Sequence, residues 1–181
     1  MYKIIALIGK AGSGKDTLLR HIQKITHNMF NEIVSYTTRP PRSGETDGIN
    51  YHFISETEFE KQIYHNKMLE YAKFNDWLYG TSLDGLSHDK INIGVFNPAG
   101  IYQLKKRSDV RLQVFYVQAC PKLRLYRQLD REDEPNVNEI MRRYKTDELD
   151  FLNLSFDFTP LKNEREEDLR INALEILDRV R

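Results

Sequence analysis

The feature that most constrains this chain is a glycine-rich segment near its N-terminus, Gly9 to Lys15, which reads GKAGSGK. It follows a nearly continuous apolar run, Tyr2 to Ile8, which is typical of a strand buried on both faces of a parallel sheet. The residues after Gly14 have the pattern of a helix. Glycines at such a junction let backbone N–H groups converge on a phosphate, and the helix N-terminus adds positive potential. The sequence therefore predicts a phosphate-binding loop at the carboxyl end of a strand.

The last residue of this loop and the two residues after it have separate expected roles. Lys15 supplies a mobile cation for the phosphates of a nucleotide. Asp16 stands where Ser or Thr ordinarily holds Mg²⁺, and Thr17 follows one position later. Because carboxylate oxygens are good magnesium ligands, Asp16 and Thr17 are the candidate metal ligands. The alternative is a glycine-rich turn that caps a helix and leaves Lys15 solvated. The residues expected at the nucleotide phosphates are Lys10, Ala11, Gly12, Ser13, Gly14, Lys15, Asp16 and Thr17.

Strand and helix patterns alternate along the rest of the chain, apart from an interruption from about Thr37 to His88 and a charged connection, Asp130 to Asn138, that is a candidate lid. After the first strand, the further candidates are Glu32 to Tyr36, Ile91 to Phe96, Leu112 to Val117 and Phe156 to Leu161. This alternation predicts a parallel sheet with helices on both faces, whose ligands collect beyond the carboxyl ends of the strands. The interruption carries short strand patterns at Asn50 to Ile54, Leu69 to Phe74 and Trp77 to Tyr79, and a capping box at Ser55 that starts a helix. We expect a small antiparallel insert there.

Composition excludes several classes of protein. The 181 residues include 27 basic and 27 acidic side chains, so no overall positive field attracts nucleic acid or an anionic membrane. The chain has one cysteine, which rules out an intrachain disulfide. The apolar run at the N-terminus is far shorter than the roughly 20 residues of a membrane span. We therefore expect one cytoplasmic domain, monomeric or homodimeric, with no nucleic-acid or membrane partner.

A second informative run extends from Ser35 to Glu45 and contains two arginines three residues apart, Arg39 and Arg42. Prolines stiffen this loop, so both guanidinium groups can be directed at one phosphate. Ser35 and Tyr51 add hydroxyl donors. The run therefore suits a monophosphate, and the alternative is a solvated basic loop.

Together, these two loops resemble the guanylate kinase family. Its members carry Ser-x-Thr-Thr-Arg-x-x-Arg-x-Gly-Glu followed by Gly-x-x-Tyr-x-Phe, and both patterns are present between Ser35 and Phe53. The likeness extends from about Lys3 to the final helix. It implies an α/β P-loop nucleoside monophosphate kinase with a five-stranded parallel core sheet flanked by helices. The single domain 1–181 would comprise a core (1–36, 89–129 and 139–181), an antiparallel NMP-binding insert (about 37–88) and a short lid (about 130–138).

The resemblance also implies an acceptor pocket. The family's phosphate-binding positions correspond to Ser35, Arg39, Arg42, Tyr51 and Tyr79. Guanine would be read by Glu70, Thr81 and Asn97, the last standing where the family has aspartate. A carboxylate accepts from the ring N–H and amino group of guanine, whereas Asn97 keeps an acceptor but lacks the charge. The alternatives for Glu70 and Asn97 are a solvated strand edge and a turn residue.

The remaining positions concern the lid and the phosphoryl donor. Arg127, Arg131 and Arg142 resemble the family's lid arginines, and the neighbouring Arg143 could take the role of Arg142. Asn163 resembles the asparagine beside the ATP adenine, although a helix cap explains it equally well. The catalytic set implied by the resemblance is Lys15, Arg39, Arg131 and Arg142.

The expected activity is transfer of the γ-phosphoryl group of ATP, with Mg²⁺, to a nucleoside monophosphate, GMP or dGMP. One alternative is a kinase with another base preference, because Asp-Thr after the loop lysine also resembles some viral deoxynucleoside monophosphate kinases. A second is a protein-binding module, since some scaffold proteins contain guanylate kinase-like domains without catalysis. A third, a kinase of nucleic-acid ends, is disfavoured by the neutral charge.

Overall fold

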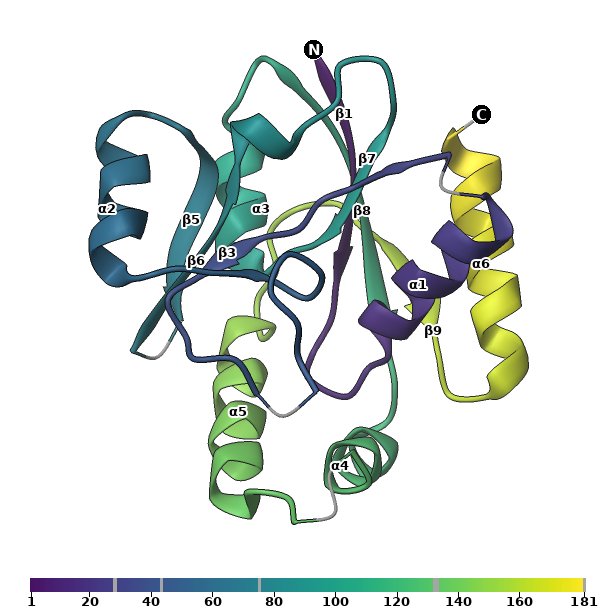
Figure 1. The fold of residues 1–181 in the computed structure, drawn as a ribbon. Helices are drawn as coiled ribbons and strands as arrows, with labels where there is room; N and C mark the ends of the chain where they lie inside the picture. Colours follow the sequence, from purple (N-terminus) through teal and green to yellow (C-terminus); the bar gives the residue numbers. More distant parts are fainter. Residues whose placement is uncertain (28, 43, 75, 132–133, 181) are drawn as a thin grey trace. The chain divides into compact units, whose positions relative to one another are not determined.

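The computed structural model describes residues 1–27, 29–42, 44–74, 76–131 and 134–180 (Figure 1). The chain divides into two compact units, and each is described by itself. The first unit contains Met1–Ile4, Phe30–Gly94 and Ala99–Leu112, and the second contains Ile5–Met29, Val95–Pro98 and Gln113–Arg181. The expected boundaries of core, insert and lid stay a prediction. Within the described ranges, no helix is both long and apolar enough to cross a membrane.

The main sheet is parallel and has five strands in the order β2-β7-β1-β8-β9, which confirms the predicted core sheet. Its central strand, β1, is buried from Ile4 to Ile8, as expected of an apolar run covered on both faces. The strands are β1 (Tyr2–Ile8), β2 (Asn31–Glu32), β7 (Asn92–Val95), β8 (Val110–Gln118) and β9 (Thr159–Lys162).

Two predicted strands differ from those observed. The pattern from Glu32 to Tyr36 is two strands rather than one, because the chain leaves the main sheet after Glu32 and enters a second sheet at Tyr36. The last strand begins at Thr159, after the position predicted for it. Phe156 and Phe158 precede it, and their rings lie 6.4 Å apart, with Phe158 5.3 Å from Tyr116. These residues pack as aromatic rings and are not part of the strand.

The second sheet belongs to the first unit and has the order β4-β3-β6-β5. Its strands are β3 (Tyr36–Thr37), β4 (His52–Phe53), β5 (Met68–Phe74) and β6 (Trp77–Ser82). β6 is antiparallel to both β3 and β5, whereas β3 and β4 are parallel, so the insert is only partly antiparallel. Position 75, between β5 and β6, lies outside the described residues.

Helices of the first unit are α2 (Glu56–Tyr64), the short 3₁₀ turn η1 (Leu83–Gly85) and most of α3 (Pro98–Leu104). α2 begins as predicted, because the Ser55 hydroxyl accepts from the N–H of Glu58 while the Glu58 carboxylate accepts from the N–H of Ser55. The capping box therefore fixes where the chain turns into the helix.

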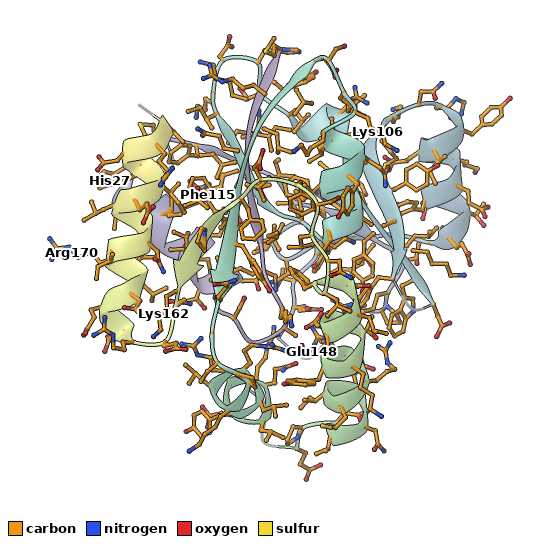
Figure 2. The ribbon with its side chains drawn as sticks, turned by 180° about the vertical axis from the view of Figure 1, so that it is seen from behind. His27, Lys106, Phe115, Glu148, Lys162 and Arg170 are labelled. Carbon is orange, nitrogen blue, oxygen red and sulfur yellow. The ribbon has the colours of Figure 1, made fainter. Side chains whose placement is uncertain are left out.

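The second unit contains α1 (Lys15–Ile25), α4 (Pro121–Leu129), α5 (Val137–Asp150) and α6 (Glu166–Val180). α1 and α6 pack side by side (Figure 1). Figure 2 shows Phe115 of β8 in the interior, where it is 1% exposed, and Arg170 extending outward from α6. α5 begins before the end of the predicted lid, because Asn136 accepts from the N–H of Glu139 and caps the helix. Residues 132–133 of that lid lie outside the described residues.

Candidate functional site

The glycine-rich segment forms a closed turn that leads into α1. Gly12 and Gly14 have positive φ angles of 78° and 90°, which residues with a Cβ rarely adopt. A Cβ at Gly12 would also overlap the backbone of Arg124, and one at Gly14 would overlap the amide of Asn163. The Ser13 N–H donates to the carbonyl of Lys10 at 3.1 Å. Because the first N–H groups of a helix have no acceptor within it, the start of α1 is suited to an anion.

Arg127 and Asn163, both expected at the ATP site, contact the phosphate loop in the second unit. Arg127 Nη1 donates to the carbonyls of Gly12 and Ser13, both at 3.3 Å. The Asn163 amide donates to the carbonyl of Ser13 at 2.8 Å, and its backbone carbonyl accepts from Arg127 at 3.0 Å. Asn163 therefore holds the loop and does not cap α6, which begins at Glu166. Donors to the loop carbonyls fix the orientation of its peptide groups.

Lys15, Asp16 and Thr17 form the first turn of α1. Asp16 and Thr17 are exposed, while Lys15 is half-buried. Their carboxylate and hydroxyl oxygens are ligands of the type that Mg²⁺ prefers, and magnesium at nucleotide sites takes only one or two protein ligands besides phosphates. The described residues contain no cluster of three or more potential metal ligands among His, Cys, Asp and Glu. The first turn of α1 thus fits a magnesium ion that arrives with a nucleotide.

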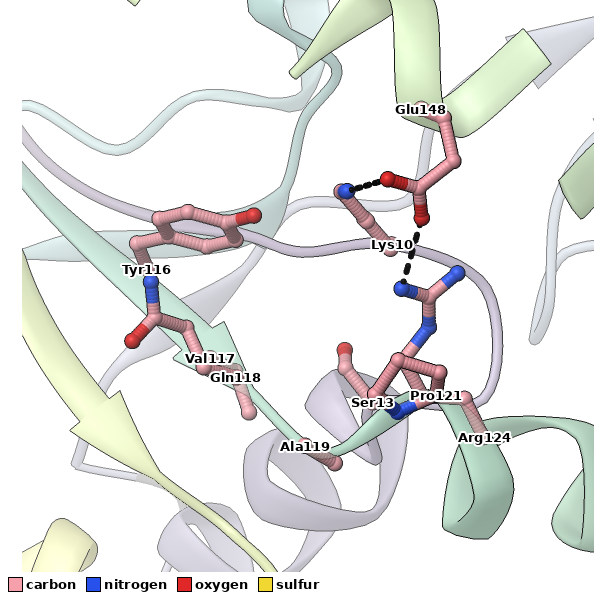
Figure 3. A pocket seen from close by; sticks show the side chains of 9 residues that line it. All are labelled: Lys10, Ser13, Tyr116, Val117, Gln118, Ala119, Pro121, Arg124 and Glu148. Atoms are coloured by element: carbon pink, nitrogen blue, oxygen red, sulfur yellow. Dashed lines mark hydrogen bonds and ion pairs between the residues drawn. The ribbon is translucent and has the colours of Figure 1, made fainter. Parts of the chain in front are cut away.

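A pocket of about 240 Å³ lies beside the loop, and Figure 3 shows its lining. An ion-pair network crosses it, in which Glu148 accepts from Lys10 at 2.6 Å and from Arg124 at 3.1 Å. The hydrogen bond from Lys10, together with that from Arg124, lowers the pKa of Glu148 despite its partial burial. The Ser13 hydroxyl also lines the pocket and is buried without a hydrogen-bond partner in the described part of the chain. Charged side chains of α4 and α5, Arg124 and Glu148, therefore lie along one side of the loop.

Three residues at this loop, Arg124, Asp147 and Glu148, are absent from the sequence predictions. Arg124 donates from Nε to the carbonyl of Ala11 at 3.2 Å, and Asp147 accepts from the N–H of Ala11 at 2.5 Å. For Arg124 and Asp147, the spacing along their helices could have indicated that the side chain faces inward. Arg124 precedes Arg127 by three residues, and Asp147 follows the buried Ile140 by seven, on the inward face of α5.

The two arginines of the acceptor loop share one carboxylate in the first unit. Both oxygens of Glu45 accept from Arg39 Nη2, at 3.0 and 2.9 Å, and one accepts from the backbone N–H of Arg42 at 2.8 Å. The side chains of Arg39 and Glu45 are only 4% and 5% exposed. Burial alone would raise the pKa of Glu45, but these hydrogen bonds and charges hold it below its ordinary value. Glu45 is therefore a carboxylate that fixes both arginines.

Aromatic rings complete this cluster. The Arg39 guanidinium lies over the rings of Tyr51 and Phe53, 5.6 Å from each centroid. Tyr51 in turn contacts Tyr79 edge to face, with centroids 5.9 Å apart. The first unit thus brings together four of the predicted phosphate-binding residues, and the fifth, Ser35, lies beside Thr81 in the same unit.

Glu70 and Thr81 face each other across β5 and β6. The hydroxyl and the backbone N–H of Thr81 both bond the Glu70 carboxyl, and Ser35 Oγ lies 3.4 Å from Thr81 Oγ1. A register shift between Met68 and Glu70 accompanies three successive buried residues at the start of β5. Burial raises the pKa of Glu70 to about 7, against the lowering effect of the Thr81 hydrogen bonds. Glu70 and Thr81 thus place a titratable carboxyl beside a hydroxyl, and both side chains are buried.

The raised pKa predicts a specific dependence of stability on pH. Because folded Glu70 binds its proton more tightly than the unfolded chain does, raising the pH from about 4.5 to about 7 favours unfolding. Each pKa unit corresponds to about 1.4 kcal/mol, so the wild-type free energy of unfolding should fall by about 3 kcal/mol relative to a Glu70→Gln variant. Urea titrations at several pH values, followed by fluorescence of Trp77, measure this. Parallel pH profiles for the two proteins would contradict the prediction.

The other predicted residues lie in the second unit. Arg131 is exposed after α4. Arg142 bonds Glu139 through both its Nε and Nη2, each at 2.7 Å, and Arg143 lies one turn before Asp147 on α5. Asn97 is half-buried at the start of α3. The three residues predicted to read guanine are therefore divided, with Glu70 and Thr81 in one unit and Asn97 in the other.

Comparisons with known proteins show which family this chain resembles. Residues 1–176 match the model of the family described as guanylate kinase. The guanylate kinase of Aster yellows witches'-broom phytoplasma is 34% identical over 166 residues, which is 89% of this chain and 79% of that protein. The guanylate kinase of Schizosaccharomyces pombe is 43% identical over 81 residues, which is 45% of this chain and 40% of that protein.

A solved structure extends the likeness to the fold. The guanylate kinase of Anaplasma phagocytophilum superimposes with a TM-score of 0.69 at 19% identity, covering 98% of this chain and 83% of that one. The sequence match over nearly the full length and the shared fold lead to one conclusion. The chain belongs to the guanylate kinase family.

Proposed function

We propose that this protein transfers the γ-phosphoryl group of ATP to GMP or dGMP and releases two nucleoside diphosphates. The observation that carries this proposal is the occurrence in one unit of Glu70, Thr81 and Ser35, which contact one another, and of the paired arginines fixed by Glu45. Such a cluster offers a carboxylate and hydroxyls for a guanine edge and guanidinium groups for a phosphate. The phosphate loop of the second unit supplies the site for the donor nucleotide.

Phosphoryl transfer needs little covalent participation by the protein, so its residues act through position and charge. In this proposal Lys15 neutralises charge that develops on the transferring group, as do Arg131 and Arg142. The N–H groups at the start of α1 add a fixed positive potential. No covalent intermediate on the protein is required.

Magnesium would accompany the donor nucleotide. Asp16 and Thr17, in the exposed first turn of α1, would hold it. When bound, Mg²⁺ neutralises part of the negative charge on the β- and γ-phosphates. Asp16 also brings a full negative charge that Ser or Thr at this position would lack, and this charge favours a dication.

The acceptor residues would hold GMP through both of its ends. Arg42 and the remaining donors of Arg39 would bind the phosphate, with the hydroxyls of Tyr51 and Tyr79. Ionised Glu70 would accept from the ring N–H and amino group of guanine, and Thr81 would donate to its carbonyl. Adenine lacks the matching donors, and leaving buried polar groups unpaired costs about 1–3 kcal/mol each.

A substrate panel tests this function. We expect MgATP-dependent ADP release with GMP and dGMP to exceed that with AMP, CMP or UMP by at least about a hundredfold, as expected when a site's buried polar groups stay unpaired. A Glu70→Gln variant should lose most of this preference, since an amide cannot accept two hydrogen bonds from guanine as a carboxylate does. Equal rates with GMP and AMP would overturn the guanine assignment. No turnover with any monophosphate, together with no ATP binding by calorimetry, would favour a binding module.

A further inference from the structure

The peptide group that joins Lys10 to Ala11 is held at both of its polar atoms. Its carbonyl, on Lys10, accepts from the N–H of Ser13 at 3.1 Å, and its N–H, on Ala11, donates to Asp147 Oδ2 at 2.5 Å. A peptide group is planar, so its C=O and N–H turn together. The carboxylate of Asp147 therefore sets the direction of the carbonyl to which the phosphate loop closes.

The rest of the segment Lys10–Ala11 is held by side chains of α4 and α5. Arg124 of α4 donates to the carbonyl of Ala11 at 3.2 Å, and Glu148 of α5 pairs with Lys10 at 2.6 Å and with Arg124 at 3.1 Å. Ala11, Arg124 and Asp147 are 7%, 3% and 8% exposed, so water competes little for these bonds. Hydrogen bonds with an ionised acceptor are the stronger class, and burial strengthens them further.

Glycines 12 and 14 make this support necessary. Both have positive φ, and glycine adopts many backbone conformations at little cost, so the loop does not hold its own shape. A phosphate is bound well only where the N–H groups already converge before it arrives. An external carboxylate that fixes the first peptide of the turn supplies that preorganisation.

Asp147 also belongs to the helix that carries Arg142 and Arg143. Asp147 follows Arg143 by four positions along the helix, a rise of about 6 Å. The bond to Ala11 therefore anchors α5 to the loop, at a point about one turn from these arginines. Loss of the bond would free both the loop and the helix.

We propose that Asp147 is a positioning residue that preorganises the phosphate loop for ATP by holding the Lys10–Ala11 peptide. This role rests on the proposed kinase function and adds a residue to its donor site. Glu148 and Arg124 assist it by fixing the two sides of the same segment.

Nucleotide binding and kinetics of two variants test the role. Asp147→Ala should weaken ATP binding, measured by calorimetry, at least tenfold and should raise the KM for ATP by a similar factor, while the KM for GMP stays within twofold. Asp147→Asn keeps an oxygen acceptor without the charge, so its loss should be smaller, about threefold. Glu175→Gln, whose carboxyl is 39% exposed on α6, serves as the control and should bind ATP like the wild type.

A second measurement does not depend on catalysis. Amide hydrogen exchange at Ala11 and Ser13 should accelerate at least tenfold in Asp147→Ala, while amides of β1 keep their wild-type rates. If the wild type phosphorylates no monophosphate, the proposed function fails, yet exchange at the loop still decides the role of Asp147. The role is overturned if Asp147→Ala is folded and binds ATP as tightly as the wild type, if both KM values rise equally, or if loop exchange is unchanged.

Discussion

A Lys15→Met variant is expected to lose about a thousandfold in kcat, because in the proposed mechanism Lys15 stabilises charge that develops only as the phosphoryl group moves. Lys15 lies at the start of α1, where the glycine turn leads into the helix. Methionine has a similar length and supports a helix equally well, so the fold should be preserved. Steady-state ADP release at saturating ATP and GMP measures the effect.

The matched control for this variant is Lys24→Met, in the last turn of the same helix. Its side chain is exposed and has no expected part in transfer, so kcat should stay within twofold of the wild type. A circular dichroism spectrum and a melting temperature for both variants exclude unfolding. If Lys15→Met retains more than a tenth of the wild-type kcat, the loop is not the phosphoryl-donor site.

Glu45→Ala should destabilise the first unit by about 3–5 kcal/mol, since it leaves a buried guanidinium without its counter-charge. Arg39 is 4% exposed and relies on both oxygens of Glu45. The same substitution removes the acceptor for the Arg42 N–H, so the acceptor loop should lose its shape and the KM for GMP should rise. Trp77, the single tryptophan of the chain, lies in β6 of this unit and reports its unfolding in urea.

An exposed ion pair provides the control. Glu175 and Arg179 are 39% and 52% exposed on α6, so Glu175→Ala should change stability by less than about 1 kcal/mol. Glu45→Gln, which keeps the size of the side chain and an acceptor, should lie between the wild type and Glu45→Ala. An equal loss for Glu45→Ala and Glu175→Ala would show that the buried pair does not hold the loop.

Much of the fold follows from local sequence patterns. β1 begins and ends at the predicted residues, and α2 begins at its predicted capping box. In both cases the determining interactions are between near neighbours in the chain. The segment from Glu32 to Tyr36 illustrates the limit, because its residues all suit a strand, while the sheet that each joins depends on partners about 40 to 60 residues away.

The candidate site shows the same division. The glycine loop and the paired arginines are short motifs, so their residues could be named from sequence. The roles of Glu45, Arg124 and Asp147 depend on where a charged group lies after folding. Asp147 contacts a residue 136 positions away, and helical spacing places it on the inward face of α5 without identifying that partner. Long-range contacts of this kind are visible only in three dimensions.

Because of the register shift at the start of β5, the residue that lies opposite Thr81 depends on the number of residues in this strand. Between Met68 and Glu70 the strand advances by two residues while β6 advances by one, from Ser82 to Thr81. Insertion of a single residue between Glu70 and Tyr71 would place the inserted side chain opposite Thr81 without changing the glutamate itself. In the proposed function, base preference therefore depends on the number of residues along this strand as well as on the identity of residue 70.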